Sequence, residues 1–146
     1  MGTQQLLLIV LSVIIVGISV VVSVSMFNNQ AYNANQQAVA AELQQYAVQC
    51  VQYFKTPVAQ GGAGQDSTII TIPLVARYIG FTSISPYSTT SDNGEFRITD
   101  ISTNPAKVTL VGLGKDVKNL NKPRVVTTVL LKTGAISTTI GTGISF

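Results

Sequence analysis

The sequence predicts an α+β fold, in which one long N-terminal α-helix packs against an antiparallel β-sheet of about four strands. Three observations lead to this prediction: an uncharged apolar run over residues 6–27, a helical pattern over residues 28–55 without Gly or Pro, and alternating apolar segments separated by turns after residue 92. Only 10% of the 146 residues are charged, against roughly 25% in an average soluble protein. The first of them is Glu42, so the uncharged N-terminal part must be shielded from water.

The apolar run, LLLIVLSVIIVGISVVVSVSMF, is long enough to cross a membrane as a helix. Its 22 residues would span about 33 Å, close to the roughly 30 Å of a hydrocarbon core. A secretory signal would have a shorter apolar core, about 7 to 15 residues, after a basic segment, whereas Gln4 and Gln5 precede this run. A permanent anchor usually has Lys or Arg beside it, so the uncharged flanks are explained if a basic leader has been removed.

Small residues are spaced along the run, at Gly17, Ser19, Ser23 and Ser25. They would let neighbouring helices approach closely, and Gly17 is a point where the helix could loosen. The alternative is a simple lipid anchor without helix–helix contacts.

The helix is expected to continue beyond the membrane-like run to about Lys55. An apolar stripe with spacings of 7, 4, 3, 4 and 4 predicts the face that packs on the head; it consists of Tyr32, Val39, Leu43, Tyr46, Cys50 and Phe54. A second, smooth stripe suits contact with another helix and consists of Ala31, Ala34, Ala38 and Ala41. The chain therefore divides into a hydrophobic helix half at 1–30, an amphipathic half at 31–56 and a β-rich head at 57–146.

Four strands with short turns are expected in the head. The segments EFRITDIS, KVTLVGLG, RVVTTVLLK and AISTTIGTGISF follow or flank turn signals at residues 92–94, 104–105 and 133–134. The face expected to cover the helix stripe consists of Phe96, Ile98, Ile101, Val108, Leu110, Val126 and Val129. Between the helix and these strands, residues 57–67 predict a Gly-rich loop, STIITI resembles a strand, and LVARYIGF a turn of helix.

The composition argues against catalysis. The chain has no His, the commonest general base and zinc ligand, and a single cysteine, Cys50, that we interpret as a small buried hydrophobe. No Gly-Lys-Ser/Thr follows the glycines of the loop, and the acidic residues lack calcium-loop spacing. We therefore expect no catalytic residue, no metal site and no cofactor. Lys115, Lys118, Lys122 and Arg124 form a loose basic cluster that is diluted by Asp116. It makes only a weak case for a nucleic-acid partner, because phosphate recognition needs a clustered basic face, and we expect a solvated loop.

The opening MGTQQLLLIVLSVIIVGI and the helix end QYFKTPVAQGGAG resemble mature bacterial type IV pilins. The resemblance is strong over residues 1–64 and only architectural beyond. It implies that a prepilin peptidase cuts before Met1 and that the new amine is methylated. The family usually has a glutamate where Gln5 stands, pairing with a neighbour's N-terminal amine, and many members have a proline where Val22 stands. Both departures concern subunit docking.

The expected function is that of a structural subunit of an extracellular type IV pilus-like filament, with an inner-membrane pool before assembly. Its expected partners are copies of itself, the membrane, the prepilin peptidase and the pilus assembly machinery. The expected assembly interface is Gln5, Leu6, Leu7, Leu8, Ile9, Val10, Leu11, Ile14, Ile15, Gly17, Ile18, Val21, Val22, Val24 and Phe27, with Gln5 and the Met1 amine setting axial register. The alternatives are a pseudopilin of a type II secretion system and a single-pass membrane-anchored binding module.

Overall fold

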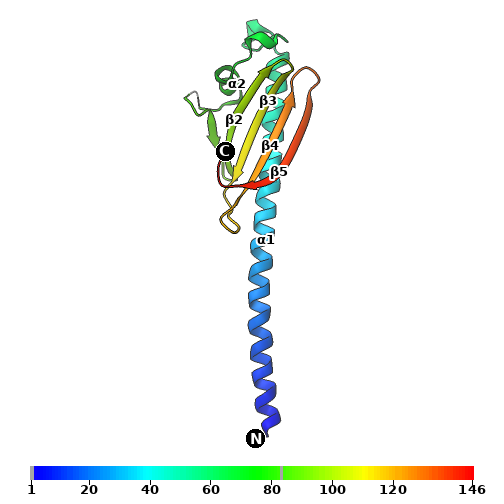
Figure 1. The fold of residues 1–146 in the computed structure, drawn as a ribbon, viewed down its shortest axis with the longest axis vertical. Helices are drawn as coiled ribbons and strands as arrows, with labels where there is room; N and C mark the ends of the chain where they lie inside the picture. Colours follow the sequence, from blue (N-terminus) through cyan, green and yellow to red (C-terminus); the bar gives the residue numbers. More distant parts are fainter. Residues whose placement is uncertain (1, 83) are drawn as a thin grey trace.

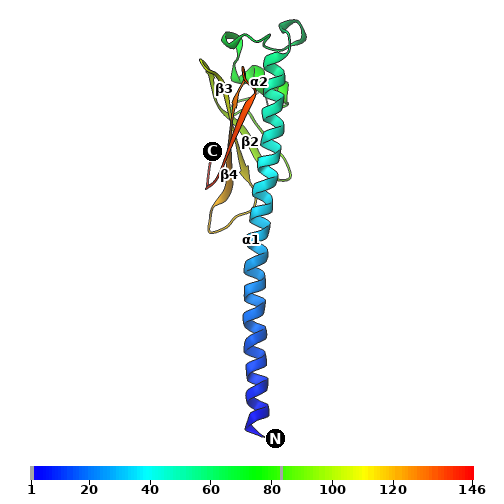
Figure 2. The same cartoon turned by 90° about the vertical axis from the view of Figure 1, so that its right-hand side faces the viewer.

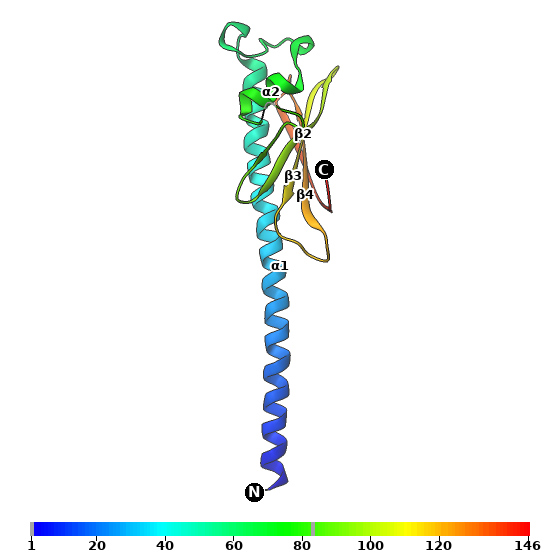
Figure 3. The same ribbon diagram turned by 90° about the vertical axis from the view of Figure 1, so that its left-hand side faces the viewer.

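The protein is one long helix with a small head against its C-terminal half (Figure 1). This arrangement comes from a computed structural model, which describes residues 2–82 and 84–146. The long helix α1 runs from Thr3 to Lys55, 53 residues, or roughly 80 Å at 1.5 Å per residue. Two views at right angles to the first show the sheet as a single layer on one side of α1 (Figures 2 and 3). The predicted α+β fold is confirmed.

Helix α1 is continuous because residues 3–55 contain no Pro and only one Gly, Gly17, at which the helix does not break. It ends where the pattern predicts. Lys55 lies in the last turn, where its charge complements the negative end of the helix dipole. The backbone N–H of Thr56 donates to the Gln52 carbonyl at 2.9 Å, and Pro57 prevents continuation.

The connection between α1 and the sheet is helical where we expected a strand. The segment STIITI forms a 3₁₀ turn over Ser67–Ile69, preceded by another at Val58–Gln60, and then enters helix α2, Ile72–Ile79. The strand interpretation was wrong because Asp66 caps the 3₁₀ turn. Its carboxylate oxygen accepts hydrogen bonds from the Thr68 backbone N–H and hydroxyl, at 2.8 and 2.7 Å, which favours the turn over an extended strand. Pro73 stands in the first turn of α2, where proline is tolerated.

The sheet has five antiparallel strands in the order β1-β2-β3-β4-β5, a simple meander. They are β1 Ser88–Thr90, β2 Gly94–Thr103, β3 Ala106–Gly114, β4 Lys122–Leu130 and β5 Ala135–Gly143. Strands β2 to β5 are the four that the turn signals predict. Strand β1 was missed because three residues, STT, are too short to carry an alternating pattern.

The core lies between α1 and the inner face of the sheet, with α2 closing its distal end. The expected sheet residues Phe96, Ile98, Val108, Leu110 and Val129 are buried there, and Ile101 packs at the edge of the same cluster. Val126 is an exception. It pairs with Val111 on the opposite face, and Val125 and Thr127 are buried in its place.

The Val126 assignment was wrong by one residue. An apolar pair, Val125-Val126, permits either register, and a shift of one residue reverses the face of every side chain. The polar member of the buried set, Thr127, has its hydroxyl 3.1 Å from that of Thr138 on β5, which satisfies both.

Two glycines of β3 allow α1 to approach the sheet closely. A Cβ atom on Gly112 would lie 2.7 Å from a Val39 methyl and 3.0 Å from both Leu43 Cδ1 and Phe96 Cδ1. A Cβ on Gly114 would collide with the Asn35 side chain. Any side chain at these positions would therefore push the helix away from the strand.

Candidate functional site: the exposed half of the long helix

The expected assembly residues lie along the free half of α1, outside the head. From Leu6 to Phe27 every large apolar side chain is exposed, from 47% at Leu11 to 71% at Phe27. Gln5 and Gly17 are also exposed. Figure 1 shows this half of α1 standing clear of the sheet. None of the described residues covers these side chains, so a partner that buries them would have to be another molecule.

Three of the four serines of this half add little polarity to it. The hydroxyls of Ser12, Ser19 and Ser23 donate to the carbonyls four residues earlier, at 2.7, 2.8 and 2.7 Å respectively. A hydroxyl satisfied within its own helix adds no unpaired group when the surface is buried. The surface thus presents methyl groups interrupted only by small residues.

Among the described residues, none makes a packing contact that requires a glycine at position 17. A Cβ built there meets no heavy atom within 4 Å, and the helix continues through it. A mid-helix Gly costs about 1 kcal/mol relative to Ala, and the packing of the described residues gives no reason for that cost. Close approach of another helix would be such a reason.

The apolar surface is too large to remain in water. Seventeen large hydrophobic side chains between Leu6 and Phe27 are about half exposed or more. At about 1.5–3 kcal/mol for full burial of each, covering their exposed portions is worth on the order of 20 kcal/mol. This exceeds the roughly 5–15 kcal/mol net stability of a typical domain. Lipid or protein must therefore cover it.

The start of the helix is electrostatically unbalanced. The first turn contains no acidic side chain, so the positive end of the helix dipole lacks a neighbouring negative charge. Gln5 lies in this turn, and its backbone N–H donates to the Gly2 carbonyl at 3.0 Å. Met1, the expected site of processing and methylation, lies outside the described residues.

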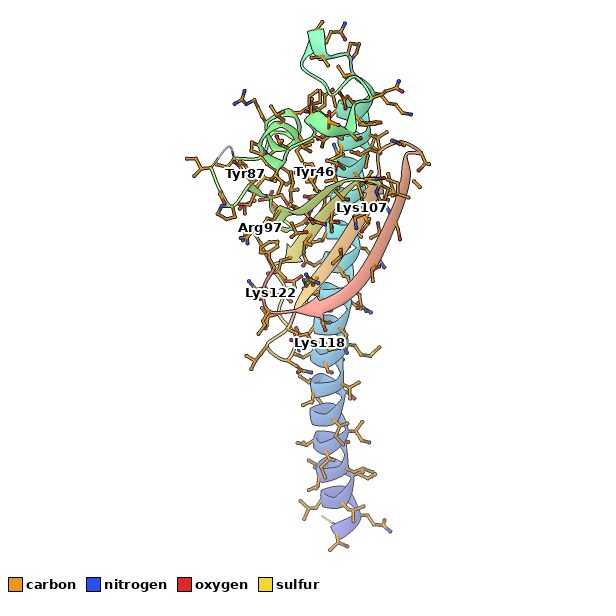
Figure 4. The ribbon with its side chains drawn as sticks, turned by 45° about the horizontal axis from the view of Figure 1, so that its top comes forward. Tyr46, Tyr87, Arg97, Lys107, Lys118 and Lys122 are labelled. Carbon is orange, nitrogen blue, oxygen red and sulfur yellow. The ribbon has the colours of Figure 1, made fainter. Side chains whose placement is uncertain are left out.

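The expected helix–head stripe faces the sheet. Tyr32, Val39, Leu43, Cys50 and Phe54 are buried, and Tyr46 is half-buried. Tyr46 packs between two phenylalanine rings, with centroids 5.0 Å from Phe81 and 5.4 Å from Phe96, and Figure 4 shows it beneath the α2 end of the head. The stripe also includes Ala47 and Tyr53, which the spacing pattern did not include. These residues hold the head on α1 and leave the first half of the helix free.

Cys50 lies within this core as a thiol. Complete burial raises its pKa to about 12, because a thiolate would be costly away from water. A thiol that stays protonated is neither a nucleophile nor a metal ligand at neutral pH. Among the described residues no group of three or more Cys, His, Asp or Glu side chains comes together in a way that would hold a metal ion.

A polar contact that we did not predict fixes the head along the helix. The Glu42 carboxylate accepts hydrogen bonds from the Ser91 hydroxyl at 2.8 Å and from the Asn93 side-chain amide. Two turns nearer the N-terminus on the same face of α1, the Asn35 side-chain amide donates to the Asn93 carbonyl at 2.8 Å. Glu42 and Asn35 thus clamp the β1–β2 turn. One sequence feature could have indicated this contact: Glu42 is the only charged residue before Lys55.

The alanine stripe of α1, which we expected to contact another helix, is not covered by the sheet. Ala34 and Ala41 are exposed, and Ala31 and Ala38 are half-buried. This narrow face of α1 continues from the exposed apolar half toward the head.

The free half of α1 is also the one candidate membrane span among the described residues, with a mean hydropathy of 3.1 over its most apolar window. Comparison with known protein families, curated proteins and solved structures finds no match.

Proposed function

We propose that this chain is the structural subunit of an extracellular helical filament of the type IV pilus kind, held in a membrane before assembly. The observation that carries the proposal is the uncovered apolar half of α1, continuous with a half that is anchored in the head. In the filament, apolar halves from many subunits bundle into a core and exclude water from one another. The heads stay outside and form the filament surface.

The geometry favours an open polymer over a closed oligomer. A helix that protrudes from one end of the head can be covered by helices of subunits displaced along its axis. Such contacts join different faces of successive subunits, and contacts of this heterologous kind generate a helical polymer when the rotation does not close. The internally bonded serines and Gly17 support close helix packing in the core.

Electron microscopy of material sheared from cells that make this chain tests the proposal. Long filaments composed of the chain are expected. A pseudopilin would leave only short periplasmic fibres, and a membrane-anchored binding module would give monomers in detergent and no fibres.

A double variant provides the sharper test. Leu8→Asp with Ile15→Asp puts two charges into the proposed core and should abolish filaments while the head stays folded, because neither side chain touches the head. Gln44→Asp with Gln52→Asp adds the same charge at exposed polar positions of α1 and should leave filaments intact. Wild-type filaments from the Leu8/Ile15 variant would refute the assembly model.

A further inference from the structure

The β3–β4 loop, Lys115–Asn121, is the part of the head that lies nearest the free half of α1 (Figures 1 and 3). Residues 116–119 of the loop and α1 residues between Val21 and Tyr32 line an open cleft of about 700 Å³. The loop therefore reaches the level of the last two turns of the apolar run. If that run spans a bilayer, the loop lies where the helix leaves the hydrocarbon for the headgroups.

The tip of this loop carries an exposed leucine in a conformation that suits glycine. Lys118 and Asn121 exchange two backbone hydrogen bonds, at 2.9 and 3.0 Å, and enclose a two-residue turn. Both central residues are left-handed, Asn119 at φ 52° and Leu120 at φ 64°. Such turns favour Asn-Gly, and a leucine there is strained. Leu120 is nonetheless 85% exposed, so packing within the subunit does not explain it.

The loop and the first three residues of β4 together carry the net positive charge of the molecule. Four of the nine basic side chains and one of the six acidic ones lie in residues 115–124, as Lys115, Lys118, Lys122, Arg124 and Asp116. This segment therefore accounts for the whole net charge of +3, and the rest of the chain is balanced. Figure 4 shows Lys118 and Lys122 at the base of the head, with Lys118 beside α1.

Exposed apolar side chains between lysines match one partner chemistry. Val117 and Leu120 would enter the boundary of the acyl chains, and the lysines would meet phosphate groups while their alkyl stems lie along the apolar surface. We propose that the β3–β4 loop docks on the anionic phospholipid headgroups around α1 and holds the head against the membrane. This inference rests on the membrane-held state of the proposed function, and not on filament formation.

A single tryptophan reports the docking, because the chain has none of its own. The full-length protein is reconstituted in vesicles of phosphatidylcholine with phosphatidylglycerol, with part of the lipid brominated as a quencher. Val117→Trp probes the loop. Val58→Trp is the matched control: the two valines are 57% and 62% exposed, but Val58 follows the far end of α1. Val13→Trp, in the middle of the apolar run, reports insertion of α1.

The expected result is blue-shifted, quenched emission from Val13→Trp and Val117→Trp and water-like emission from Val58→Trp. Replacing Lys115, Lys118 and Lys122 by Gln should shift the docked population roughly a hundredfold toward release, since each charge near an anionic surface contributes about fivefold. Phosphatidylcholine alone, or molar salt that screens the charges, should also release the loop.

Leu120→Gly separates docking from folding. Glycine relieves the left-handed backbone, so the head should melt at the same or a higher temperature, while the docked population in the Val117→Trp background falls roughly tenfold with the loss of the leucine side chain. A head that melts lower, or docking unchanged by this variant, would overturn the assignment.

The three probes distinguish the possible failures. Water-like emission from Val117→Trp in anionic vesicles, with Val13→Trp inserted, overturns the docking proposal and leaves the filament proposal standing. Equal quenching of Val117→Trp and Val58→Trp means that the head binds the membrane without orientation and overturns it as well. Failure of Val13→Trp to insert removes the membrane-held state of the proposed function, and the docking proposal fails with it.

Discussion

Replacing Gly112 by alanine should loosen the whole head, although it adds one methyl group. The new Cβ would lie 2.7 Å from Val39 Cγ1 and 3.0 Å from Leu43 Cδ1 and Phe96 Cδ1, where carbon atoms normally stay about 3.5–4.0 Å apart. All three neighbours are completely buried. Val39 is β-branched and sits in a helix, so its χ1 has little freedom to move away.

The expected cost follows from these overlaps. Overpacking of a core by one methyl group costs typically about 1–3 kcal/mol, and three simultaneous overlaps place Gly112→Ala at the upper end. Alanine also reduces the freedom of the unfolded chain, which returns about 0.5–1 kcal/mol. The net loss should be about 2 kcal/mol, or roughly 10 °C in Tm for a head of this size.

Gly141→Ala is the matched control. It is the same substitution in the same sheet, on β5, but its Cβ would meet only the Arg124 carbonyl oxygen, at an ordinary 3.8 Å. This variant should melt at or slightly above the wild-type temperature. Thermal unfolding of the full chain in detergent, followed by tyrosine fluorescence or near-ultraviolet circular dichroism, compares the three proteins. Equal melting of Gly112→Ala and Gly141→Ala would refute the close approach of α1 to β3.

Three further outcomes are expected. Glu42→Ala should lower the free energy of unfolding by about 2–3 kcal/mol, because it removes charge-assisted hydrogen bonds from Ser91 and Asn93, and wild-type melting of this variant would contradict the clamp. Cys50 has its pKa raised by burial, so near pH 8 a disulfide reagent should react with it only at the rate of unfolding; rapid labelling of the native protein would contradict its burial. Gly17→Ala should leave the isolated subunit at least as stable, whereas Gly17→Leu should block filaments if helices meet there, and fibres in normal yield from Gly17→Leu would exclude close packing at that point.

The parts of the fold that sequence reasoning found are those with long, regular patterns. The 53-residue helix and the four longer strands each have a regular hydrophobic pattern that can be recognised in the sequence. Three of the turns beside these strands contain an Asn-Gly, Asn-Pro or Thr-Gly pair, and the β3–β4 loop contains none. The errors lie where the pattern is short or degenerate. Strand β1 has three residues, STIITI has strand composition but a capping Asp66, and Val125-Val126 permits two registers.

The candidate site divides in the same way. The exposed apolar half of α1, which we propose as the assembly surface, could be located from the sequence, since a run of apolar residues without charge requires shielding wherever it lies. The docking role that we propose for the β3–β4 loop could not be predicted from the sequence. It depends on the position of the loop beside Val21–Tyr32 and on the left-handed backbone at Leu120, about a hundred residues later in the chain. The Glu42 clamp likewise joins residues 49 and 51 positions apart.

The amino-acid sequence alone therefore determined that this chain has a long helix, half of it too apolar for water, and a head of antiparallel strands. Hydrophobic periodicity and helix length depend on residues that are close in the sequence, so they can be recognised before the tertiary structure is known. Only the tertiary structure decided which face of each strand meets the helix, how closely β3 approaches it through Gly112, and which charged loop lies beside the membrane-like run. These features are contacts between segments that are distant in the sequence, and neither segment alone determines such a contact.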